Sequence, residues 1–389
     1  MSKKIAVGID VGTYHVKVVV AEAAVNGRDT PKIIGTGFSE SKGIRHGYII
    51  HRGETTKSIL QALRQAEKSS GIKIQEAYTS VGGIGLSSAT SVGSTAISRA
   101  DSEVTGLDIE KAMEASRLEI PQGLLLNRKI VHSVPLQYKI DGRTVVGHNP
   151  IGQKGSKLEV KVLYILCLEQ HLNELVSAIE DAGVEVTDVV VSPLAASLVT
   201  LNKAQKIAGV VLANIGAETV SIVVFENNIP ISLEVFPLGG TDITHDIALG
   251  LRIDLEEAES VKRGNHRSDY SRKKLDEIIV ARLTDIFELI ENHLKRIGRN
   301  GLLPAGICIT GGTSRIATIQ DLAKASLNLP SRIASMHFGG NIKDLNDSVW
   351  SVAYGLTIVG LTDEEKPLGI DFMSKTKKKA WAWIKQFLP

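Results

Sequence analysis

Short apolar runs, separated by glycine-bearing or polar turns, open the chain. Residues 5–12, 15–24 and 31–38 are rich in valine and isoleucine, which favour strands, and together they predict a three-stranded meander. In residues 55–71 the apolar side chains recur every three or four positions instead. This spacing predicts a helix, and Gly71 is placed to end it.

The same succession of strand, turn, strand, turn and strand returns roughly 200 residues further on, in residues 210–240, and such an internal repeat predicts two similar lobes. Strands and helices alternate elsewhere, which indicates an α/β fold. Further strands are predicted at residues 76–83, 161–168 and 185–192. Helices are predicted at residues 170–183, 193–201 and 348–360 and between 242 and 299, with a strand–Gly–Gly–helix unit at 306–326.

Residues 86–161 break this alternation and predict a small inserted α+β module. The segment begins with a stretch rich in glycine, serine and threonine. A helix is expected at residues 108–119, begun by Asp108. A hairpin is expected at residues 131–147, because the dipeptide Asp141–Gly142 favours a two-residue turn.

Composition limits the functions that the chain can have. With 389 residues it is long enough for two domains, and 43% hydrophobic residues suffice for ordinary cores. The net charge of +2 argues against a general polyanion binder, so no nucleic-acid partner is expected. Cys167 and Cys308 lie in apolar runs, which predicts buried thiols rather than a disulfide framework or a metal cluster. No segment looks like a signal peptide or a membrane span, so a cytosolic protein is expected.

The turn between the first two predicted strands carries the first candidate chemistry. Gly12 lets backbone N–H groups approach a ligand closely, and Thr13 adds a hydroxyl group, with Tyr14 next in the turn. Such a turn can hold a phosphate, while Asp10 at the strand end can hold Mg²⁺ through water. Ordinary hairpins contain similar turns, so the motif by itself leaves both interpretations open.

A similar turn stands at the same place in the second predicted lobe. Gly216 supplies the bend, Thr219 supplies a hydroxyl group, and the turn is completed by Asn214, Ala217 and Glu218. Two opposed hairpins, one from each lobe, would hold a β- or γ-phosphate between them. The sequence therefore predicts a phosphate site at the junction of the lobes.

Two pairs of glycines add candidate nucleotide contacts. Gly311 and Gly312 end a predicted strand just before Thr313, where bare backbone would let an α-phosphate and a base pack closely. Gly239 and Gly240 follow the last strand of the second meander and are assigned to the same site.

One ionic pair belongs to the same set of candidates. Glu259 and Lys262 share one face of a predicted helix because they are three positions apart. They would reach a ribose and the edge of an adenine. A surface ion pair is the alternative, and the spacing alone favours it.

In this order and spacing, the four motifs resemble those of the actin/Hsp70/sugar-kinase ATPase superfamily. Residues 41–67, 129–162 and 237–251 resemble the corresponding segments of the FtsA family of bacterial cell-division proteins. The resemblance covers nearly the whole chain. It implies an α/β, actin-like bilobed ATPase fold with an inserted SHS2-like α+β module and a C-terminal amphipathic helix, and it implies ATP and Mg²⁺ as ligands.

The resemblance also implies a division of the chain into parts. They are a nucleotide-binding part of lobe I (1–85, 162–196 and 349–362), the inserted module (86–161), a nucleotide-binding part of lobe II (197–241 and 301–348), a helical part of lobe II (242–300), a linker (363–374) and a terminal amphipathic helix (375–389).

Three residues depart from the superfamily pattern. Many members have an aspartate and a second glycine in the second phosphate motif, where this chain has Asn214 and Ala217. A connecting helix often opens with a glutamate or glutamine that is a candidate for orienting the attacking water, where this chain has Ser192. These changes leave ATP binding intact and predict weak or absent ATPase activity, with Asp10 as the remaining carboxylate at the γ-phosphate end.

The last fifteen residues carry five of the 45 lysines and arginines and no acid. Wound as a helix, they have one apolar arc of about 160° with lysines opposite it. The arc holds Trp381, Trp383, Ile384, Phe387 and Leu388, and the lysines are Lys378, Lys379 and Lys385. This pattern predicts an interfacial helix on an anionic lipid membrane, and a docking helix or a disordered tail is the alternative. One short helix binds weakly, so several joined in a polymer would bind through avidity.

The leading hypothesis is an ATP-binding, polymerising cell-division protein. By the resemblance it would form head-to-tail filaments, tether the C-terminal peptide of FtsZ, and so the Z ring, to the cytoplasmic face of the membrane at the division site, and help recruit other divisome proteins. FtsZ would dock on residues 242–300, with Arg282 as a candidate contact and an ordinary surface charge as the alternative. A PilM-like scaffold of type IV pilus assembly is the other function considered, and the terminal helix argues against it. A chaperone or a sugar kinase is disfavoured by Asn214, Ala217 and Ser192.

Overall fold

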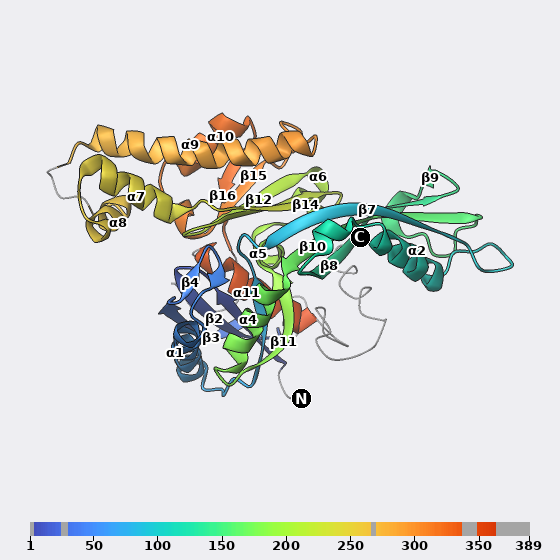
Figure 1. Ribbon diagram of the computed structural model, residues 1–389, viewed down its shortest axis with the longest axis horizontal. Coiled ribbons are helices and arrows are strands. Elements are labelled where there is room, and N and C mark those ends of the chain that lie inside the picture. The colour runs from blue at the N-terminus through green and yellow to red at the C-terminus, as the bar shows by residue number, and fades with distance from the viewer. Residues whose placement is uncertain (1–3, 25–29, 266–269, 337–347, 363–389) are drawn as a thin grey trace.

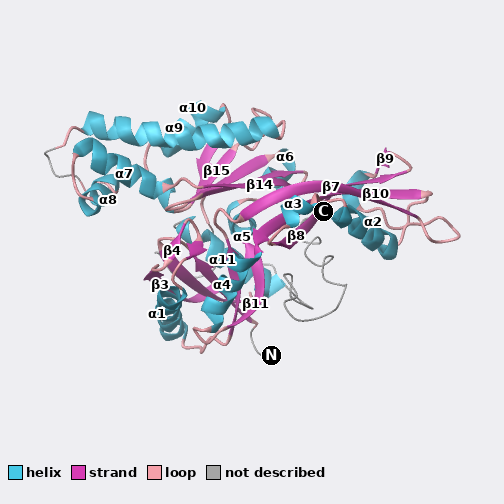
Figure 2. Ribbon diagram, viewed as in Figure 1, coloured by secondary structure: helices cyan, strands magenta, loops and turns pink. Residues whose placement is uncertain are grey.

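Residues 4–24, 30–265, 270–336 and 348–362 are described in the computed structural model of the protein. They form two lobes and a third, smaller unit that extends to one side (Figure 1). Each lobe is built on a five-stranded sheet, and the third unit on a four-stranded sheet. Helices cover the outer sides of the two lobes, and α5 (Ser192–Thr200) and α11 (Ser351–Thr362) lie between them (Figure 2).

Lobe I lies at the bottom of Figure 1 and contains the opening meander. Its strands are β1 (Ile5–Val11), β2 (His15–Glu22), β3 (Lys32–Glu40), β6 (Glu76–Val81) and β11 (Glu185–Val191), beside a small pair, β4 (Ile44–Arg45) and β5 (Tyr48–Ile49). Its helices are α1 (Arg52–Ser70), α4 (Glu169–Glu180), α5 (Ser192–Thr200) and α11 (Ser351–Thr362). The first three strands pair antiparallel as predicted, β6 and β11 add parallel neighbours, and the sheet order is β11-β6-β1-β2-β3.

Lobe II, at the upper left of Figure 1, repeats this topology. Its strands are β12 (Val210–Ile215), β13 (Val220–Glu226), β14 (Ile229–Phe236), β15 (Ile307–Thr310) and β16 (Ser331–Ile333), in the order β14-β13-β12-β15-β16. Its helices are α6 (Lys203–Ala208), α7 (Gly240–Leu251), α8 (Leu255–Lys262), α9 (Arg272–Arg296) and α10 (Ile319–Leu327), with the short 3₁₀ turns η2 (Gly312–Arg315) and η4 (Ser348–Trp350) near the junction. Both sheets therefore consist of three antiparallel strands followed by two parallel ones, and the predicted repeat is confirmed.

One hydrophobic cluster extends from lobe I into lobe II. It joins most of the buried aliphatic side chains of lobe I to Leu212 and Phe225 from one face of the lobe II sheet. The other face of that sheet packs against α7, α8, α9 and α10. Helices α5 and α11 cross at the junction, where a Cβ on Gly355 would lie 1.9 Å from the carbonyl oxygen of Ala195. Only glycine permits this approach, which places the two connecting helices directly behind the gap between the lobes.

The predicted helix that ends at Gly71 is present as α1. Gly71 adopts a left-handed conformation with φ of 72°, and its N–H donates to the carbonyl of Glu67. The helix begins at Arg52, three residues before the expected start, because the carbonyl of His51 accepts the first helical hydrogen bonds from Glu54 and Thr55.

The third unit, at the right of Figure 1, is the inserted module. It contains β7 (Leu86–Ala96), β8 (Arg128–Ile140), β9 (Arg143–Thr144) and β10 (Lys157–Leu168), with α2 (Gly106–Leu118), α3 (Gln122–Leu125) and the 3₁₀ turn η1 (Val146–His148). The sheet order is β7-β10-β8-β9, and the turn at Asp141–Gly142 joins β8 to β9 as predicted. Strand β10 pairs with β7 and β8 down to Leu168, so the module's sheet continues past residue 161, where its end was expected.

Two details of the module differ from the sequence-based expectation. The stretch rich in glycine, serine and threonine forms β7, and α2 approaches it so closely that a Cβ on Gly93 would lie 2.0 Å from the nitrogen of Ser116. The expectation that Asp108 begins the helix was wrong. Thr105 is the N-cap, and Asp108 lies in the first turn, where it accepts hydrogen bonds from Thr105 and Ser98. Burial alone would raise the pKa of Asp108, but these hydrogen bonds outweigh it and lower the pKa to about 2.

The buried thiols expected at Cys167 and Cys308 are confirmed. Burial raises the pKa of Cys167 to about 12 and that of Cys308 to about 11, so both stay protonated at neutral pH. None of the described helices combines the length and the apolar character that crossing a bilayer requires. The linker 363–374 and the terminal helix expected at 375–389 lie outside the described residues.

Candidate functional site

A cavity of about 610 Å³ opens between the two lobes. Both glycine-bearing hairpins, β1–β2 of lobe I and β12–β13 of lobe II, line it, together with α8, η2 and the residues around η4. The two hairpins therefore meet at the junction of the lobes, as predicted.

In the first hairpin the turn is closed by its own backbone. The N–H of Gly12 donates to the carbonyl of His15 at 3.2 Å, and a Cβ on Gly12 would lie only 3.0 Å from the same oxygen. Thr13 and Tyr14 follow it and line the cavity. This compact turn therefore forms part of the cavity wall.

Asp10 lies at the end of β1 but both of its carboxylate oxygens are engaged. Oδ1 accepts a hydrogen bond from the Ser80 hydroxyl at 3.1 Å, and Oδ2 forms an ion pair with Lys17 Nζ at 3.1 Å. Lys17 stands directly opposite Asp10 in the β1–β2 register. The pair is largely buried, with 12% of the Asp10 side chain and 15% of the Lys17 side chain exposed.

The second hairpin has the same turn with different side chains. The N–H of Gly216 donates to the carbonyl of Thr219 at 2.9 Å, as Gly12 does to His15. Asn214, Ala217 and Thr219 line the cavity with it. Glu218 does not line the cavity. Its carboxylate crosses to lobe I and accepts a hydrogen bond from the backbone N–H of His46 at 2.5 Å.

The two glycine pairs are each divided between the cavity wall and its support. Gly240 and Gly312 line the cavity, whereas Gly239 and Gly311 pack against the second hairpin. A Cβ on Gly239 would lie 2.4 Å from the carbonyl oxygen of Ala217, and one on Gly311 would lie 2.4 Å from that of Ile215. A Cβ on Gly312 would meet no atom within 4 Å, so its backbone faces open space. Thr313 also lines the cavity, and its hydroxyl donates to the carbonyl of Gly216 at 3.0 Å.

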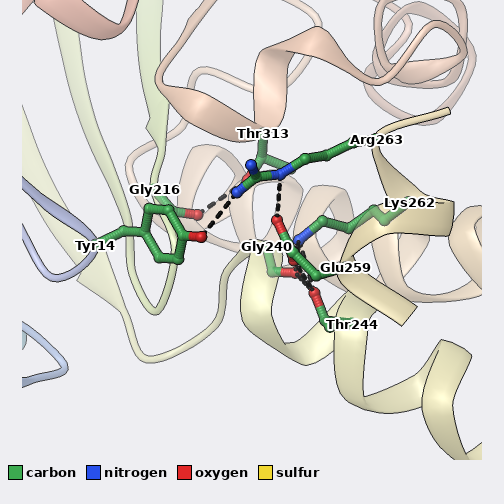
Figure 3. A network of polar contacts seen from close by, with 8 residues as sticks. All are labelled: Tyr14, Gly216, Gly240, Thr244, Glu259, Lys262, Arg263 and Thr313. Carbon is green, nitrogen blue, oxygen red and sulfur yellow. Dashed lines mark hydrogen bonds and ion pairs between the residues drawn. The ribbon is translucent and has the colours of Figure 1, made fainter. Parts of the chain in front are cut away.

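Glu259 and Lys262 form an ion pair, as the alternative expected, but the pair lies in the cavity wall and is largely buried. Their side chains are 26% and 13% exposed and form an ion pair of 2.6 Å. Lys262 Nζ also donates to the carbonyl of Gly240 and to the Thr244 hydroxyl, which in turn donates to Glu259 (Figure 3). Burial would raise the pKa of Glu259, but its hydrogen bonds with Lys262 and Thr244 lower it, so the carboxylate is ionised at neutral pH.

The structure adds Arg263, which sequence reasoning missed. Its guanidinium lies between the lobes, as Figure 3 shows: Nε donates to Glu259 of lobe II, and Nη2 donates to the Tyr14 hydroxyl of lobe I at 2.8 Å. Arg263 and Tyr14 are 249 positions apart in the chain, so no local pattern could have paired them.

Lys17 was also missed, although the sequence held a signal for it. It interrupts the apolar run of β2, flanked by buried valines at 16 and 18, and it faces Asp10 across a short hairpin. A lysine at such a position is expected to pair with a carboxylate on the neighbouring strand. Burial lowers the pKa of nearby His15, and the charges of Lys17 and Arg263 lower it further, so His15 is neutral at pH 7.

Comparison with known proteins then decides the family. A sequence profile described as "Cell division protein FtsA" matches residues 211–355, and one described as "SHS2 domain inserted in FTSA" matches residues 83–166. The protein named Cell division protein FtsA of Bacillus subtilis (strain 168) is 32% identical over 362 residues, which cover 87% of this chain and 80% of the relative. The chain belongs to the FtsA family of cell-division proteins. Cell division protein FtsA of Pseudomonas aeruginosa is 29% identical over 384 residues, covering 92% of this chain and 90% of the relative.

Solved structures confirm the actin-like fold expected for an FtsA protein. A PilM–PilN type IV pilus biogenesis complex superposes with a TM-score of 0.68 at 18% identity, covering 92% of this chain and 98% of the other. MreB5 of Spiroplasma citri bound to ADP superposes with a TM-score of 0.53 at 13% identity, covering 91% of this chain and 95% of the other. At such identities the likeness shows the fold alone.

Two FtsA features expected from the sequence lie away from the cleft. Residues 83–166 of the SHS2 match coincide with the sheet of the inserted module. Arg282, on α9, is 27% exposed and forms a bidentate ion pair with Asp246 of α7 at 2.6 and 3.0 Å, with a further contact to Asp285. It therefore ties two helices together. The membrane residues expected in the tail lie outside the described part of the chain.

Proposed function

We propose that the cleft binds ATP. The observation that carries this proposal is that Gly12 and Gly216, in two turns of the same construction, line one cavity from opposite lobes. Backbone N–H groups in such turns are suited to phosphate oxygens. The open backbone at Gly312 offers space for the rest of the nucleotide, and Glu259 and Lys262 lie in the wall of the same cavity, where contacts to ribose and adenine are proposed. That MreB5, a protein of the same fold, binds ADP supports this ligand class.

The proposed contacts fall into two groups. Phosphate contacts are assigned to Gly12, Thr13, Tyr14, Asn214, Gly216, Ala217 and Thr219. Contacts to the nucleoside and α-phosphate are assigned to Gly240, Glu259, Lys262, Gly312 and Thr313. Glu218, Gly239 and Gly311 are proposed to shape the second hairpin without touching the ligand.

Mg²⁺ does not fit the site in the way expected from the sequence. Both oxygens of Asp10 are bonded, one to Ser80 and one to the ammonium of Lys17. Among the described residues there is no group of three or more histidine, cysteine, aspartate and glutamate side chains that would hold a metal ion. No step is therefore assigned to a metal bound at Asp10.

Weak hydrolysis is proposed for the same cleft. Ser192 opens α5 at the back of the cavity, where its hydroxyl donates to the carbonyl of Val81 at 3.0 Å. The hydroxyl hydrogen of Ser192 is thus already used in a hydrogen bond to the backbone, and the side chain of Asn214 carries no negative charge. Both features disfavour a strongly activated water and support slow turnover.

We further propose that the protein polymerises, tethers FtsZ to the cytoplasmic face of the membrane at the division site, and helps recruit other divisome proteins. Membership of the FtsA family supports this role. The membrane contact is assigned to residues 375–389 on their sequence pattern. The FtsZ contact is assigned to the helical part of lobe II, where the bonds of Arg282 to Asp246 suggest that it positions α7 and α9 for that contact.

Co-sedimentation with lipid vesicles tests this function. The full chain is expected to pellet with vesicles that contain anionic lipid, to carry purified FtsZ with it, and to pellet less with neutral vesicles. A chain that ends at residue 374 is expected to stay in the supernatant with its FtsZ. If the shortened chain pellets as the full chain does, the tail is not the anchor.

A PilM-like scaffold is the second candidate, since the PilM–PilN structure superposes with a TM-score of 0.68. The two functions differ in their partner. FtsZ carried to vesicles supports the division role, whereas a chain that leaves FtsZ in solution would favour the scaffold.

A further inference from the structure

A largely buried cation, Lys17, lies in the wall of the cavity. Lys17 lines the cavity, and its Nζ lies 3.7 Å from the position that a Cβ on Gly12 would take. The ammonium group is therefore beside the turn proposed to hold phosphate. Its partner Asp10 supplies the carboxylate expected at the phosphate end, and that charge is already balanced.

The other carboxylates near the cavity are engaged too. Glu259 pairs with Lys262 and with Arg263, and Glu218 bonds to His46 on the far lobe. In the second hairpin, Asn214 presents a neutral amide. Mg²⁺ prefers carboxylate and phosphate oxygens in near-octahedral geometry. In the described wall of this cavity, each carboxylate already faces a cationic side chain.

The formal charge of the cavity wall is positive. Among the described residues, four cationic side chains and two carboxylates line it, which gives a net charge of +2. The cations are Lys17, Lys262, Arg263 and Arg315, and the carboxylates are Asp10 and Glu259. Such a wall attracts a polyphosphate and repels a divalent cation. The pKa of His15, lowered by burial and then by Lys17, Arg263 and Arg315, responds to the same field.

Resting on the ATP binding proposed above, we infer that Lys17 takes the place of a divalent cation in this cleft, so that the protein binds ATP without Mg²⁺. An ammonium group has three N–H donors, so Lys17 can keep its bond to Asp10 and donate to a phosphate oxygen as well. Leaving Asp10 altogether would strand a buried carboxylate, which is strongly unfavourable. A hydrated Mg²⁺ ion next to Asp10 would be repelled by the positive charge of the Lys17 ammonium group.

The test is the affinity of the full chain for ATP, measured by calorimetry in EDTA and in excess Mg²⁺. The affinities of the unaltered protein are expected to agree within about threefold. Lys17→Met is expected to weaken metal-free binding by about tenfold or more, and to recover much of it in Mg²⁺, because Asp10 is then an unpaired carboxylate. Thermal unfolding of each variant shows whether it is folded.

Two further variants keep the test decisive. Lys57→Met removes the same charge from an exposed position on α1, outside the cavity, and is expected to change neither affinity. Asp10→Asn removes the carboxylate and leaves Lys17 in place, so metal-free binding is expected to hold or strengthen. If Lys17→Met fails to fold, Asp10→Asn still decides, since a metal held through Asp10 would make this variant lose its Mg²⁺-supported affinity.

The outcomes separate this inference from the proposal that it rests on. No ATP binding in either condition would contradict the proposed function itself. ATP binding that requires Mg²⁺, with a gain above about tenfold, would overturn the inference and leave ATP binding intact. Unchanged metal-free binding in Lys17→Met would also overturn it.

Discussion

The two hairpins that face the cleft have the same backbone and different side chains. Each closes its turn with a glycine N–H bonded to a carbonyl three residues on, at Gly12 and at Gly216. The first hairpin adds a cross-strand ion pair, Asp10 with Lys17, whereas the second has Asn214 and Ala217 in the corresponding region. The repeated backbone is the part of the cavity that is proposed to contact phosphate from both lobes. Of the two hairpins, both of which lie within the described residues, the lobe I hairpin is the one whose strands are joined by an ion pair.

Each hairpin also reaches across to the opposite lobe. Tyr14 of the first hairpin accepts a hydrogen bond from Arg263 of lobe II, and Glu218 of the second accepts one from His46 of lobe I. The lobes are therefore bridged on two sides of the cavity by residues that lie next to the phosphate turns. Ligand binding at the turns would bear directly on how the lobes close.

The largest expected effect comes from breaking what the hairpins share. Gly12→Val and Gly216→Val would each place a branched side chain against the turn's own carbonyl, 3.0 or 3.1 Å from its Cβ. Each is expected to weaken ATP binding by about 1–3 kcal/mol, roughly 5- to 150-fold, measured by calorimetry.

Gly53→Val is the matched control, because a Cβ at Gly53 would meet no atom within 4 Å. It is expected to bind ATP as the unaltered chain does. If only one of the two hairpin variants loses affinity for ATP, then only one hairpin contacts the ligand. The proposal that both lobes bind phosphate in the same way would then be wrong.

A smaller effect is expected from making the second hairpin acidic. Asn214→Asp would lower the net charge of the cavity wall from +2 to +1. Metal-free ATP binding is expected to weaken by about 1 kcal/mol, and added Mg²⁺ is expected to restore it, because the new carboxylate stands opposite Ser221 in the β12–β13 register, where Asp10 has Lys17. The measurement is ATP affinity in EDTA and in Mg²⁺.

Asn214→Ala serves as its control, since it removes the amide without adding charge. An identical response of the two variants to Mg²⁺ would show that charge is not what distinguishes the hairpins.

The smallest effects are expected from the two bridges. Tyr14→Phe removes the hydroxyl that accepts from Arg263 and keeps the ring, and Glu218→Gln weakens the bond to His46. Both contacts are partly exposed, so each variant is expected to raise the ATP dissociation rate by no more than about threefold in stopped-flow measurements. A much larger change in only one of them would mean that a single bridge governs closure.

The sequence predicted the parts of this site that depend on local backbone chemistry. Gly12 and Gly216 were found because a tight turn between two strands demands glycine, and Gly71 because it ends a helix. Strand β7 was not predicted, since its small polar residues carry no apolar alternation and it is held by β10 and α2. The partners of Tyr14 and Glu218 were out of reach for a related reason. They lie 249 and 172 positions away in the chain and meet only when the lobes fold together.

The choice between a surface ion pair and a nucleotide contact at Glu259 and Lys262 was likewise a matter of tertiary structure. Spacing put the two side chains on one helix face, and only the packing of α8 against α7 shows that this face is turned into the cleft. Lys17 is the instructive exception, because the hairpin register alone would have placed it opposite Asp10.

The central claim is that the two hairpins together form an ATP site, and calorimetric titration of the full chain with ATP tests it most directly. The account predicts saturable binding of one ATP per chain that is lost or strongly weakened in both Gly12→Val and Gly216→Val. Absence of saturable binding in the unaltered chain, or full affinity in both valine variants, would contradict it.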